Sequence, residues 1–194
     1  VLDWREFIVH RQRYIAGIHA SYRKRLDESG VVLMPCHGRL IDAHTVVNAD
    51  GVPLRGEHLL IATGGRPSRP DIPGAALGQV SDDFFNLCAA PRRVAIVGGG
   101  YVAVELAGVL QALGSQVELF VRGPRLLDGF DAQITAELAD DMRQHGVHLH
   151  FGHAVAALEE APHDGAIVLA DDGTRSERFD RVIFATGRTP NTGG

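Results

Sequence analysis

A glycine-rich stretch decides which folds are open to this chain: residues 94–108 read VAIVGGGYVAVELAG. An apolar run meets three glycines, and a helical pattern follows directly. Gly98 permits a tight turn, Gly100 lets the backbone approach a pyrophosphate closely, and Ala103 keeps the helix near the strand. The N–H groups and the partial positive charge at the start of that helix favour phosphate. The spacing predicts a dinucleotide-binding strand–turn–helix unit, and the alternative is a glycine-rich turn without a ligand.

The residues around this stretch alternate between strand and helix patterns. Such alternation is typical of a parallel sheet with crossover helices. The predicted fold class is therefore α/β, with a Rossmann-like parallel sheet, crossover helices and a β-meander. The predicted strands cover 93–100, 116–122 and 146–152, a hairpin and a last buried strand fall within 167–188, and the predicted helices cover 101–114 and 131–145.

The first 64 residues follow a different pattern. A long helix is predicted from an N-cap at Asp3 to Gly30, because large apolar residues recur there at steps of three and four. The runs VVLM, GRLI and TVV suggest a small β-meander, and HLLIATGG has the pattern of a buried strand. The proline-rich RPSRPDIPG that follows is typical of a linker, and SDDFF begins a short helix capped by Ser81. The predicted domains are 1–64 and 65–194.

The composition of the chain argues against several classes of function. Its 194 residues carry a net charge of −5 without a basic stripe, which disfavours a nucleic-acid partner. No apolar run approaches the ~18 residues that a membrane span needs, so no membrane partner is expected. The two cysteines, Cys36 and Cys88, lie far apart, which indicates a reducing, cytoplasmic setting and gives no zinc pattern.

Four histidines, at positions 145, 148, 150 and 153, gather in one segment and raise the possibility of a metal site. His148 and His150 would share one face of a strand. No cysteine or acid stands at ligand spacing beside them, so the sequence favours solvated or hydrogen-bonded histidines. No metal ligand is predicted.

The end of the second strand of the glycine unit indicates which dinucleotide binds. Sites for NAD usually place an acid there for the ribose 2′-hydroxyl, whereas NADP sites place an arginine near the 2′-phosphate. Val121 occupies the expected acid position, Arg122 follows it and Arg125 lies in the next loop. Glu118 stands too early in the strand to reach the ribose. An arginine gains a charge-assisted contact with phosphate, so NADP(H) is the predicted cofactor, and the alternative is a pair of surface arginines.

The chain resembles the glutathione reductases of the pyridine nucleotide-disulfide oxidoreductase family in the stretches ATGGRPSRPDIPG, VGGGYVAVELAGVLQALGSQVELFVR, GFD and FATGRTPNT. The likeness runs along the whole chain and covers the middle of such an enzyme. It implies that 1–64 form part of an FAD-binding domain and 65–194 the NADP(H)-binding domain. The implied parent is a homodimeric flavoprotein of glutathione metabolism and cell redox homeostasis, passing electrons from NADPH through FAD and a redox-active disulfide to glutathione disulfide.

The resemblance also implies roles for single residues. Tyr101 would be a mobile ring that covers the flavin, and Glu105 would lie near the nicotinamide carboxamide, so these two are the predicted catalytic residues. Tyr14 and Tyr22 would face the glutathione disulfide, although their helical spacing by itself favours core positions. The predicted cofactor-binding residues are Gly98, Gly100, Tyr101, Val102, Ala103, Glu105, Arg122, Arg125, Gly187 and Arg188 for NADP(H), and His37, Gly38, Thr63 and Gly64 for FAD.

The sequence departs from the family pattern in ways that leave alternatives open. Asp128 stands where these enzymes usually have a second phosphate-binding arginine, and an acid there would weaken phosphate binding. Either Arg125 compensates from the same loop, or the protein tolerates NADH better than its relatives. The chain contains no CxxxxC disulfide, so we expect no turnover from it alone. The alternatives are a stand-alone NADP-binding module, or an NADH-using relative such as a modified-glutathione, dihydrolipoamide or mercuric reductase.

Overall fold

The computed structural model describes residues 3–193, and the chain divides into two compact units. One unit contains residues 6–64, and the other contains 65–193 together with 3–5. The second unit holds the glycine-rich stretch and all the described hydrophobic side chains that are buried.

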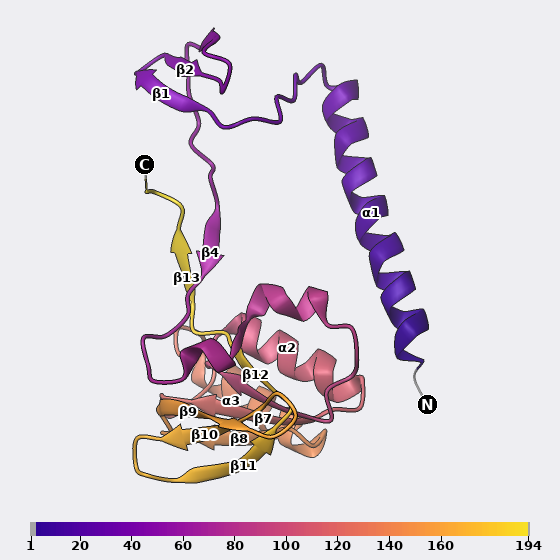
Figure 1. Ribbon diagram of the computed structural model, residues 1–194, viewed down its shortest axis with the longest axis vertical. Coiled ribbons are helices and arrows are strands. Elements are labelled where there is room, and N and C mark those ends of the chain that lie inside the picture. The colour runs from indigo at the N-terminus through magenta and orange to yellow at the C-terminus, as the bar shows by residue number, and fades with distance from the viewer. Residues whose placement is uncertain (1–2, 194) are drawn as a thin grey trace. The chain divides into compact units, whose positions relative to one another are not determined.

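A five-stranded parallel sheet forms the centre of the larger unit, which confirms the predicted α/β class (Figure 1). Helix α2 (Tyr101–Ala112) connects β6 to β7, and helix α3 (Ala132–Gln144) connects β7 to β8. These are the two predicted crossover helices. In spatial order, the strands are β5 (Gln79–Val80), β12 (Arg181–Phe184), β6 (Arg93–Val97), β7 (Gln116–Val121) and β8 (His148–Phe151).

The ends of the two crossover helices follow local sequence signals. Gly114, with a φ of 95°, follows α2 in a left-handed conformation that suits glycine. Asp131 caps α3, since its Oδ1 accepts hydrogen bonds from the backbone N–H groups of Gln133 at 2.9 Å and Ile134 at 3.2 Å. Both boundaries agree with the sequence prediction.

A three-stranded antiparallel meander follows β8, formed by β9 (Val155–Ala161), β10 (Gly165–Ala170) and β11 (Arg175–Phe179). Figure 1 shows this meander and α2 on opposite sides of the parallel sheet. The predicted fold included a β-meander in this unit, but the strand-by-strand prediction placed only a hairpin here and did not locate β9, whose sequence VAALEEA is rich in residues that favour helices. Pairing with β10 along its whole length makes this segment a strand.

Side chains on the two faces of the parallel sheet enter two separate hydrophobic cores. Along β6, Val94 and Ile96 join the core beneath α2 and α3, whereas Ala95 and Val97 join the core beneath the meander. All four are nearly inaccessible, because a parallel sheet with both faces covered needs continuous apolar strands. The sheet therefore holds the carboxyl ends of its strands in fixed positions.

LLIATGGRP at 59–67 resembles VIFATGRTP at 182–190 in sequence, and the last three residues of the two stretches pair with each other as β4 (Gly65–Pro67) and β13 (Arg188–Pro190). The prediction of a linker at RPSRPDIPG was therefore wrong at its first residues, which form an antiparallel ribbon. Further on lie two 3-10 helices, η1 (Ala75–Leu77) and η2 (Ser81–Asn86). Ser81 does not cap the second. Instead, the Asp83 carboxylate accepts the backbone N–H of Val80 at 2.9 Å.

The smaller unit contains most of helix α1 (Trp4–Glu28) and the strands β1 (Arg39–Asp42), β2 (Thr45–Val47) and β3 (Pro53–Arg55). The three strands form an antiparallel sheet, as the predicted meander required. The run VVLM at 31–34 is not a strand, and neither is HLLIATG at 58–64. A strand needs an adjacent strand to pair with, and neither run pairs in any of the described sheets.

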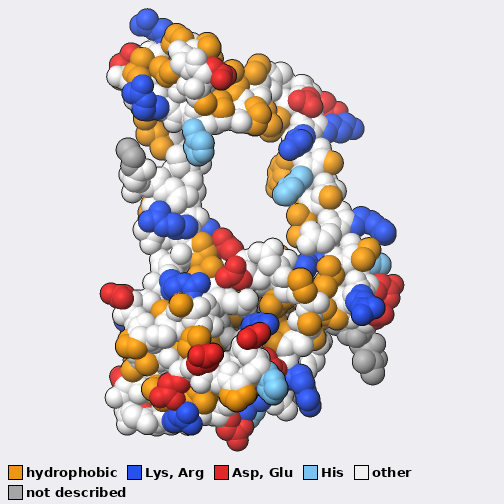
Figure 2. Space-filling model, in the orientation of Figure 1, with side chains coloured by type: hydrophobic (Ala, Val, Ile, Leu, Met, Phe, Trp, Pro, Cys, Tyr) orange, Lys and Arg blue, Asp and Glu red, His pale blue; other side chains and the backbone are white. Residues whose placement is uncertain are grey.

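The apolar side chains of this unit are exposed or at most half-buried. Helix α1 buries none of its described residues, and Leu60 is 92% exposed. Figure 2 shows hydrophobic side chains along the helix and over the small sheet. The prediction that helical spacing favours core positions for Tyr14 and Tyr22 was therefore wrong within the described chain, where the two side chains are 72% and 62% exposed.

Candidate dinucleotide-binding site

The glycine turn between β6 and α2 is built by close packing of its first two residues. Gly98 has a φ of 141°, and its N–H donates to the Phe120 carbonyl at 2.9 Å. A Cβ on Gly98 would stand 2.4 Å from the Ala185 carbonyl oxygen, and one on Gly99 would stand 2.7 Å from Val121 Cγ1. These two positions therefore need glycine because β7 and β12 leave no space for a side chain.

Gly100 is different, because a Cβ there would meet no described atom within 4 Å. Its φ of −86° and ψ of 179° are open to any residue. Gly100 is the N-cap of α2, and no side chain caps this helix end. The first N–H groups of a helix have no partner within the helix, so an anion is favoured beside Gly100. Packing against the described chain does not require a glycine here, and the uncapped helix end leaves room for an anion.

The loop after β7 folds back onto the glycine turn. The Leu127 N–H donates to the Gly99 carbonyl at 2.7 Å, and Phe130 N–H donates to the Leu127 carbonyl at 2.8 Å. Leu127 itself has a left-handed φ of 49°. The loop that carries the two predicted phosphate-binding arginines is thereby tied to the site.

The two arginines of this loop differ in their surroundings. Arg122 is exposed, and its guanidinium makes no hydrogen bond or ion pair with any described residue. Arg125 donates from Nε to Asp128 Oδ1 at 2.8 Å and from Nη2 to the Asp128 backbone carbonyl at 2.6 Å. The sequence indicated both arginines but gave no sign that Asp128 holds one of them.

Gly187 and Arg188 follow the end of β12. Gly187 has a φ of 121°, and its carbonyl accepts the Ser68 N–H at 2.9 Å. Arg188 pairs with Asp82 at 3.0 Å and donates to the Gly65 carbonyl. Arg188 therefore braces the β4–β13 ribbon, an engagement that sequence reasoning missed because Asp82 lies 106 positions away.

The strand order brings these segments to one edge of the sheet. β6 lies between β7 and β12. The chain continues from β6 to β7 and β8 on one side, and the later strand β12 pairs with β6 on the other side. At such a switch point, a crevice opens outside the carboxyl ends of the strands. Three segments meet there, namely the glycine turn after β6, Arg122 after β7 and Gly187 after β12.

Helix α2 adds side chains to the same edge. Tyr101 is its first residue and is 61% exposed, and Glu105 follows one turn later, also exposed. Residues four apart share a helix face, so both side chains stand together beside the turn. Val102 is half-buried and Ala103 is fully buried, which lets α2 pack closely on the sheet.

The predicted FAD and substrate residues all lie in the other unit, residues 6–64. Tyr14 and Tyr22 are 72% and 62% exposed on α1. His37 and Thr63 are also exposed. Gly38 packs against Val46, since a Cβ there would stand 2.8 Å from Val46 Cγ1, and Gly64 has a φ of 68°.

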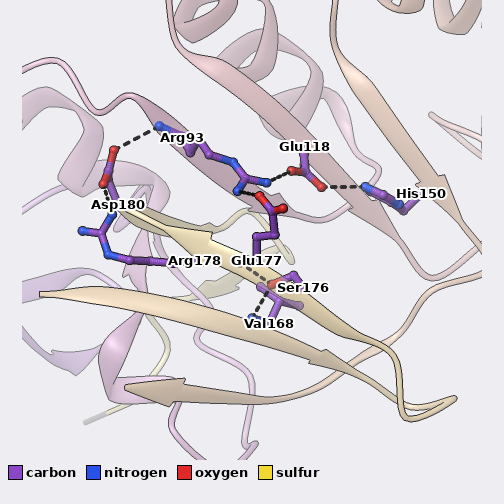
Figure 3. A network of polar contacts seen from close by, with 8 residues as sticks. All are labelled: Arg93, Glu118, His150, Val168, Ser176, Glu177, Arg178 and Asp180. Atoms are coloured by element: carbon purple, nitrogen blue, oxygen red, sulfur yellow. Dashed lines mark hydrogen bonds and ion pairs between the residues drawn. The ribbon is translucent and has the colours of Figure 1, made fainter. Parts of the chain in front are cut away.

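A polar network crosses the sheet away from the glycine turn (Figure 3). Arg93 of β6 donates to Glu118 of β7 at 2.6 Å and also pairs with Glu177 of β11. His150 of β8 donates from Nε2 to the other Glu118 oxygen at 2.9 Å, and its ring stacks on Phe120. The His150 hydrogen bond, with help from Arg93, holds the pKa of Glu118 below its usual range although burial opposes this.

Because Glu118 is bonded in this network, it is not available to bind a ribose hydroxyl. The network also gives His150, one of the four clustered histidines, a hydrogen-bond partner. His145 and His153 are bonded too, each through Nδ1 to a backbone carbonyl, those of Asp141 at 2.8 Å and Phe151 at 2.9 Å. Among the described residues, no three His, Cys, Asp or Glu side chains form a group that could hold a metal. Within the same residues, no helix combines the length and hydropathy of a membrane span.

Comparison with protein families adds the decisive observation. A model of the pyridine nucleotide-disulphide oxidoreductase family matches residues 3–194. The chain belongs to this family. Among curated relatives, the chloroplastic/mitochondrial glutathione reductase of Pisum sativum is 37% identical over 190 residues, or 98% of this chain. The glutathione reductase of a Nostoc species is 34% identical over 193 residues.

The chain spans 34% and 42% of the lengths of these two relatives. Among solved structures, the HOCl-induced flavoprotein disulfide reductase RclA from Escherichia coli matches 96% of the chain with a TM-score of 0.82 at 24% identity. A ferredoxin reductase from Rhodopseudomonas palustris matches 87% of the chain with a TM-score of 0.75 at 23% identity. At these identities, the two structures show a shared fold.

Proposed function

We propose that this chain supplies the NADP(H)-binding part, and a portion of the FAD-binding part, of a flavin-dependent disulfide reductase. In the complete protein, the substrate would be glutathione disulfide. The two glutathione reductases support the substrate class through their 34–37% identity along the chain. The homodimer and the cytoplasmic setting remain predictions that go with this family.

The observation that carries the proposal is the open space at Gly100. Packing explains Gly98 and Gly99, but the third glycine borders a gap at an uncapped helix N-terminus. A dinucleotide pyrophosphate fits that position because it is an anion and needs close backbone approach. The residues present therefore fit the cofactor that the family name implies.

The preference for NADP(H) rests on Arg122. Its side chain is exposed beside the site and is not engaged by the described chain, so it can donate to a 2′-phosphate without losing another contact. No acid is available for a ribose 2′-hydroxyl at the end of β7, since Val121 is buried and Glu118 is held by Arg93 and His150.

A bound nicotinamide would supply a hydride to the flavin. The Tyr101 ring, exposed at the start of α2, would cover the nicotinamide position until the cofactor enters. Glu105, one turn later, would accept a hydrogen bond from the carboxamide and so orient the ring. Thr63 and Gly64 would lie along the flavin, and His37 and Gly38 near its adenine. Tyr14 and Tyr22 would face the disulfide substrate.

Binding calorimetry with NADP⁺ and NAD⁺ tests the proposal. We expect NADP⁺ to bind more tightly, and Arg122→Ala to remove most of the difference by weakening NADP⁺ about tenfold or more. Gly100→Ala should weaken both cofactors about tenfold or more, because a methyl group would occupy the pyrophosphate position. Its backbone angles suit alanine, so the fold should persist.

Gly108→Ala is the matched control. Gly108 lies in the same helix, and a Cβ there would also meet nothing within 4 Å. Its substitution should leave both affinities unchanged. Equal affinities for NADP⁺ and NAD⁺ in the unmodified chain would refute the NADP preference, and tight binding by Gly100→Ala would refute the pyrophosphate position.

A further inference from the structure

The loop after β7 holds two arginines and one acid, and the acid is bound to only one of the arginines. Asp128 accepts two hydrogen bonds from Arg125, one through its carboxylate and one through its backbone carbonyl. Arg122 lies three residues before Arg125 and makes no hydrogen bond with a carboxylate of the described residues. The two cations are therefore not equivalent as binders of an added anion.

A carboxylate and a phosphate bind a guanidinium in the same way. The first is planar and the second tetrahedral, but both are anions whose oxygens accept parallel N–H hydrogen bonds. Asp128 thus occupies two of the five N–H donors of Arg125. A phosphate reaching Arg125 would have to displace the carboxylate and would then lie close to its negative charge, which opposes binding.

The fold keeps Asp128 and Arg125 beside the glycine turn. The Leu127 N–H is bonded to the Gly99 carbonyl, so the loop cannot leave the glycine turn without losing that contact. Arg125 also lines a hollow of about 250 Å³ with Ala132, Ala136 and Arg143, which places its side chain on the α3 side of the loop.

We infer that Asp128 is a cofactor-selectivity residue, which holds Arg125 and leaves Arg122 as the cation that distinguishes NADP from NAD. This inference rests on the proposed function, because it requires the loop to receive the ribose of a dinucleotide. It deepens that function by assigning opposite roles to two neighbouring arginines. The chain discriminates against NAD less strictly than it would with both arginines free.

The test is a double-mutant cycle on the affinity for NADP⁺, with NAD⁺ measured in parallel. Arg125→Ala alone should change the NADP⁺ affinity less than about twofold, because the Asp128 carboxylate already neutralises Arg125 and opposes a second anion beside it. Asp128→Ala should raise NADP⁺ affinity about three- to tenfold and leave NAD⁺ unchanged, since it frees Arg125 and removes a repulsive charge. Asp128→Asn, which keeps an acceptor, should raise it less.

In the double variant Asp128→Ala/Arg125→Ala, the gain in NADP⁺ affinity should be at least about half lost. The gain is measured as the logarithm of the ratio of variant to parent affinity. The gain from Asp128→Ala should also shrink at high salt. The control is Glu159→Ala, which removes the carboxylate of another exposed pair, Arg175–Glu159 at 2.8 Å, on the meander. It changes net charge equally and should leave both affinities unchanged.

The outcomes separate this inference from the proposed function. If Asp128→Ala leaves the NADP⁺ affinity unchanged, or if Arg125→Ala weakens NADP⁺ as much as Arg122→Ala, the inference is wrong while the proposed site stands. If neither Arg122→Ala nor Asp128→Ala alters a measurable affinity, the loop does not receive the ribose and both fail.

Discussion

Both units of this chain contain apolar runs in their sequences, but only the larger unit buries them in a core. In the unit of residues 65–193, strands covered on both faces create two cores, and side chains such as Ile96 and Leu119 are fully buried. In the unit of residues 6–64, helix α1 buries none of its described residues and Leu60 is 92% exposed. Regular secondary structure therefore forms in both units, but only one of them has the layers that turn apolar residues into a core.

This difference in burial predicts which substitutions lower the stability of the protein. The site residues on the larger unit sit on a rigid edge, whereas those on the smaller unit sit on elements that hold few contacts of their own. Substitutions of the same type in the two units should separate sharply in their effects on stability.

The largest contrast is expected for leucine truncation. Leu119→Ala should lower the free energy of unfolding by about 2–5 kcal/mol, because Leu119 is fully buried in the core beneath α2 and α3. Leu60→Ala, at a position 92% exposed, should change it by less than about 0.5 kcal/mol. Denaturant unfolding followed by far-UV circular dichroism measures both. Equal losses would show that the two units are stabilised in the same way.

Glycine substitution should give the next contrast. Gly98→Ala should cost about 2–4 kcal/mol, since the Cβ would collide with the Ala185 carbonyl and φ is 141°. Gly64→Ala meets no neighbouring atom, and its φ of 68° should cost only about 1–2 kcal/mol. Thermal unfolding of the two variants gives the comparison, and a Gly98→Ala protein as stable as the parent would contradict the tight packing of this turn.

Acid should weaken the larger unit through Glu118. Its pKa is lowered in the folded state, chiefly by the His150 hydrogen bond. A lowered pKa contributes stability above the pKa of the unfolded chain, and this contribution is lost as pH falls through the folded pKa. Glu118→Gln should therefore cost about 1–2 kcal/mol at neutral pH and show a flatter decline of stability between about pH 5 and pH 3.

The control for Glu118 comes from α1. Glu28 lies 3.6 Å from Lys24 on the exposed surface of that helix. Glu28→Gln should cost less than about 0.5 kcal/mol, because exposed pairs of this type contribute little. If Glu118→Gln retains the full acid-dependent decline, another group controls it.

Helix capping should produce the smallest contrast. Asp131→Ala removes two hydrogen bonds from the start of α3, which packs into the core, and should cost about 1 kcal/mol. Asp3 accepts the Arg5 N–H at 2.9 Å at the start of α1, and Asp3→Ala should cost less, because α1 buries no described residue. Global stability from denaturant titration separates the two variants, with serine replacements expected to restore most of each loss.

Sequence reasoning predicted the elements whose signals are local. The glycine turn, Asp131 as the cap of α3 and Gly114 beyond α2 depend on neighbouring residues, and each appears at or within two residues of its predicted place. HLLIATG failed as a strand because pairing depends on partners elsewhere, and β9 was missed because pairing with β10 overrides its helical composition.

In the candidate site too, the sequence predicted the features that depend on neighbouring residues and missed those that depend on tertiary packing. GxGxxA and the arginines after Val121 are visible as patterns, so the sequence could predict a dinucleotide site and favour NADP. It could not distinguish Gly98 and Gly99, which packing requires, from Gly100, which borders open space. That distinction depends on the positions of Val121, the last residue of β7, and Ala185, which follows β12.

The sequence by itself determined the strand–turn–helix unit, the family resemblance and the positive charge beside the site, because these follow from residue types at short spacing. Only the tertiary structure decided which charges are free. Asp128 holds Arg125, Asp82 holds Arg188, and Arg93 with His150 holds Glu118, whereas Arg122 has no such contact among the described residues. An arginine's availability depends on the distance and direction of its nearest carboxylate, and folding sets both.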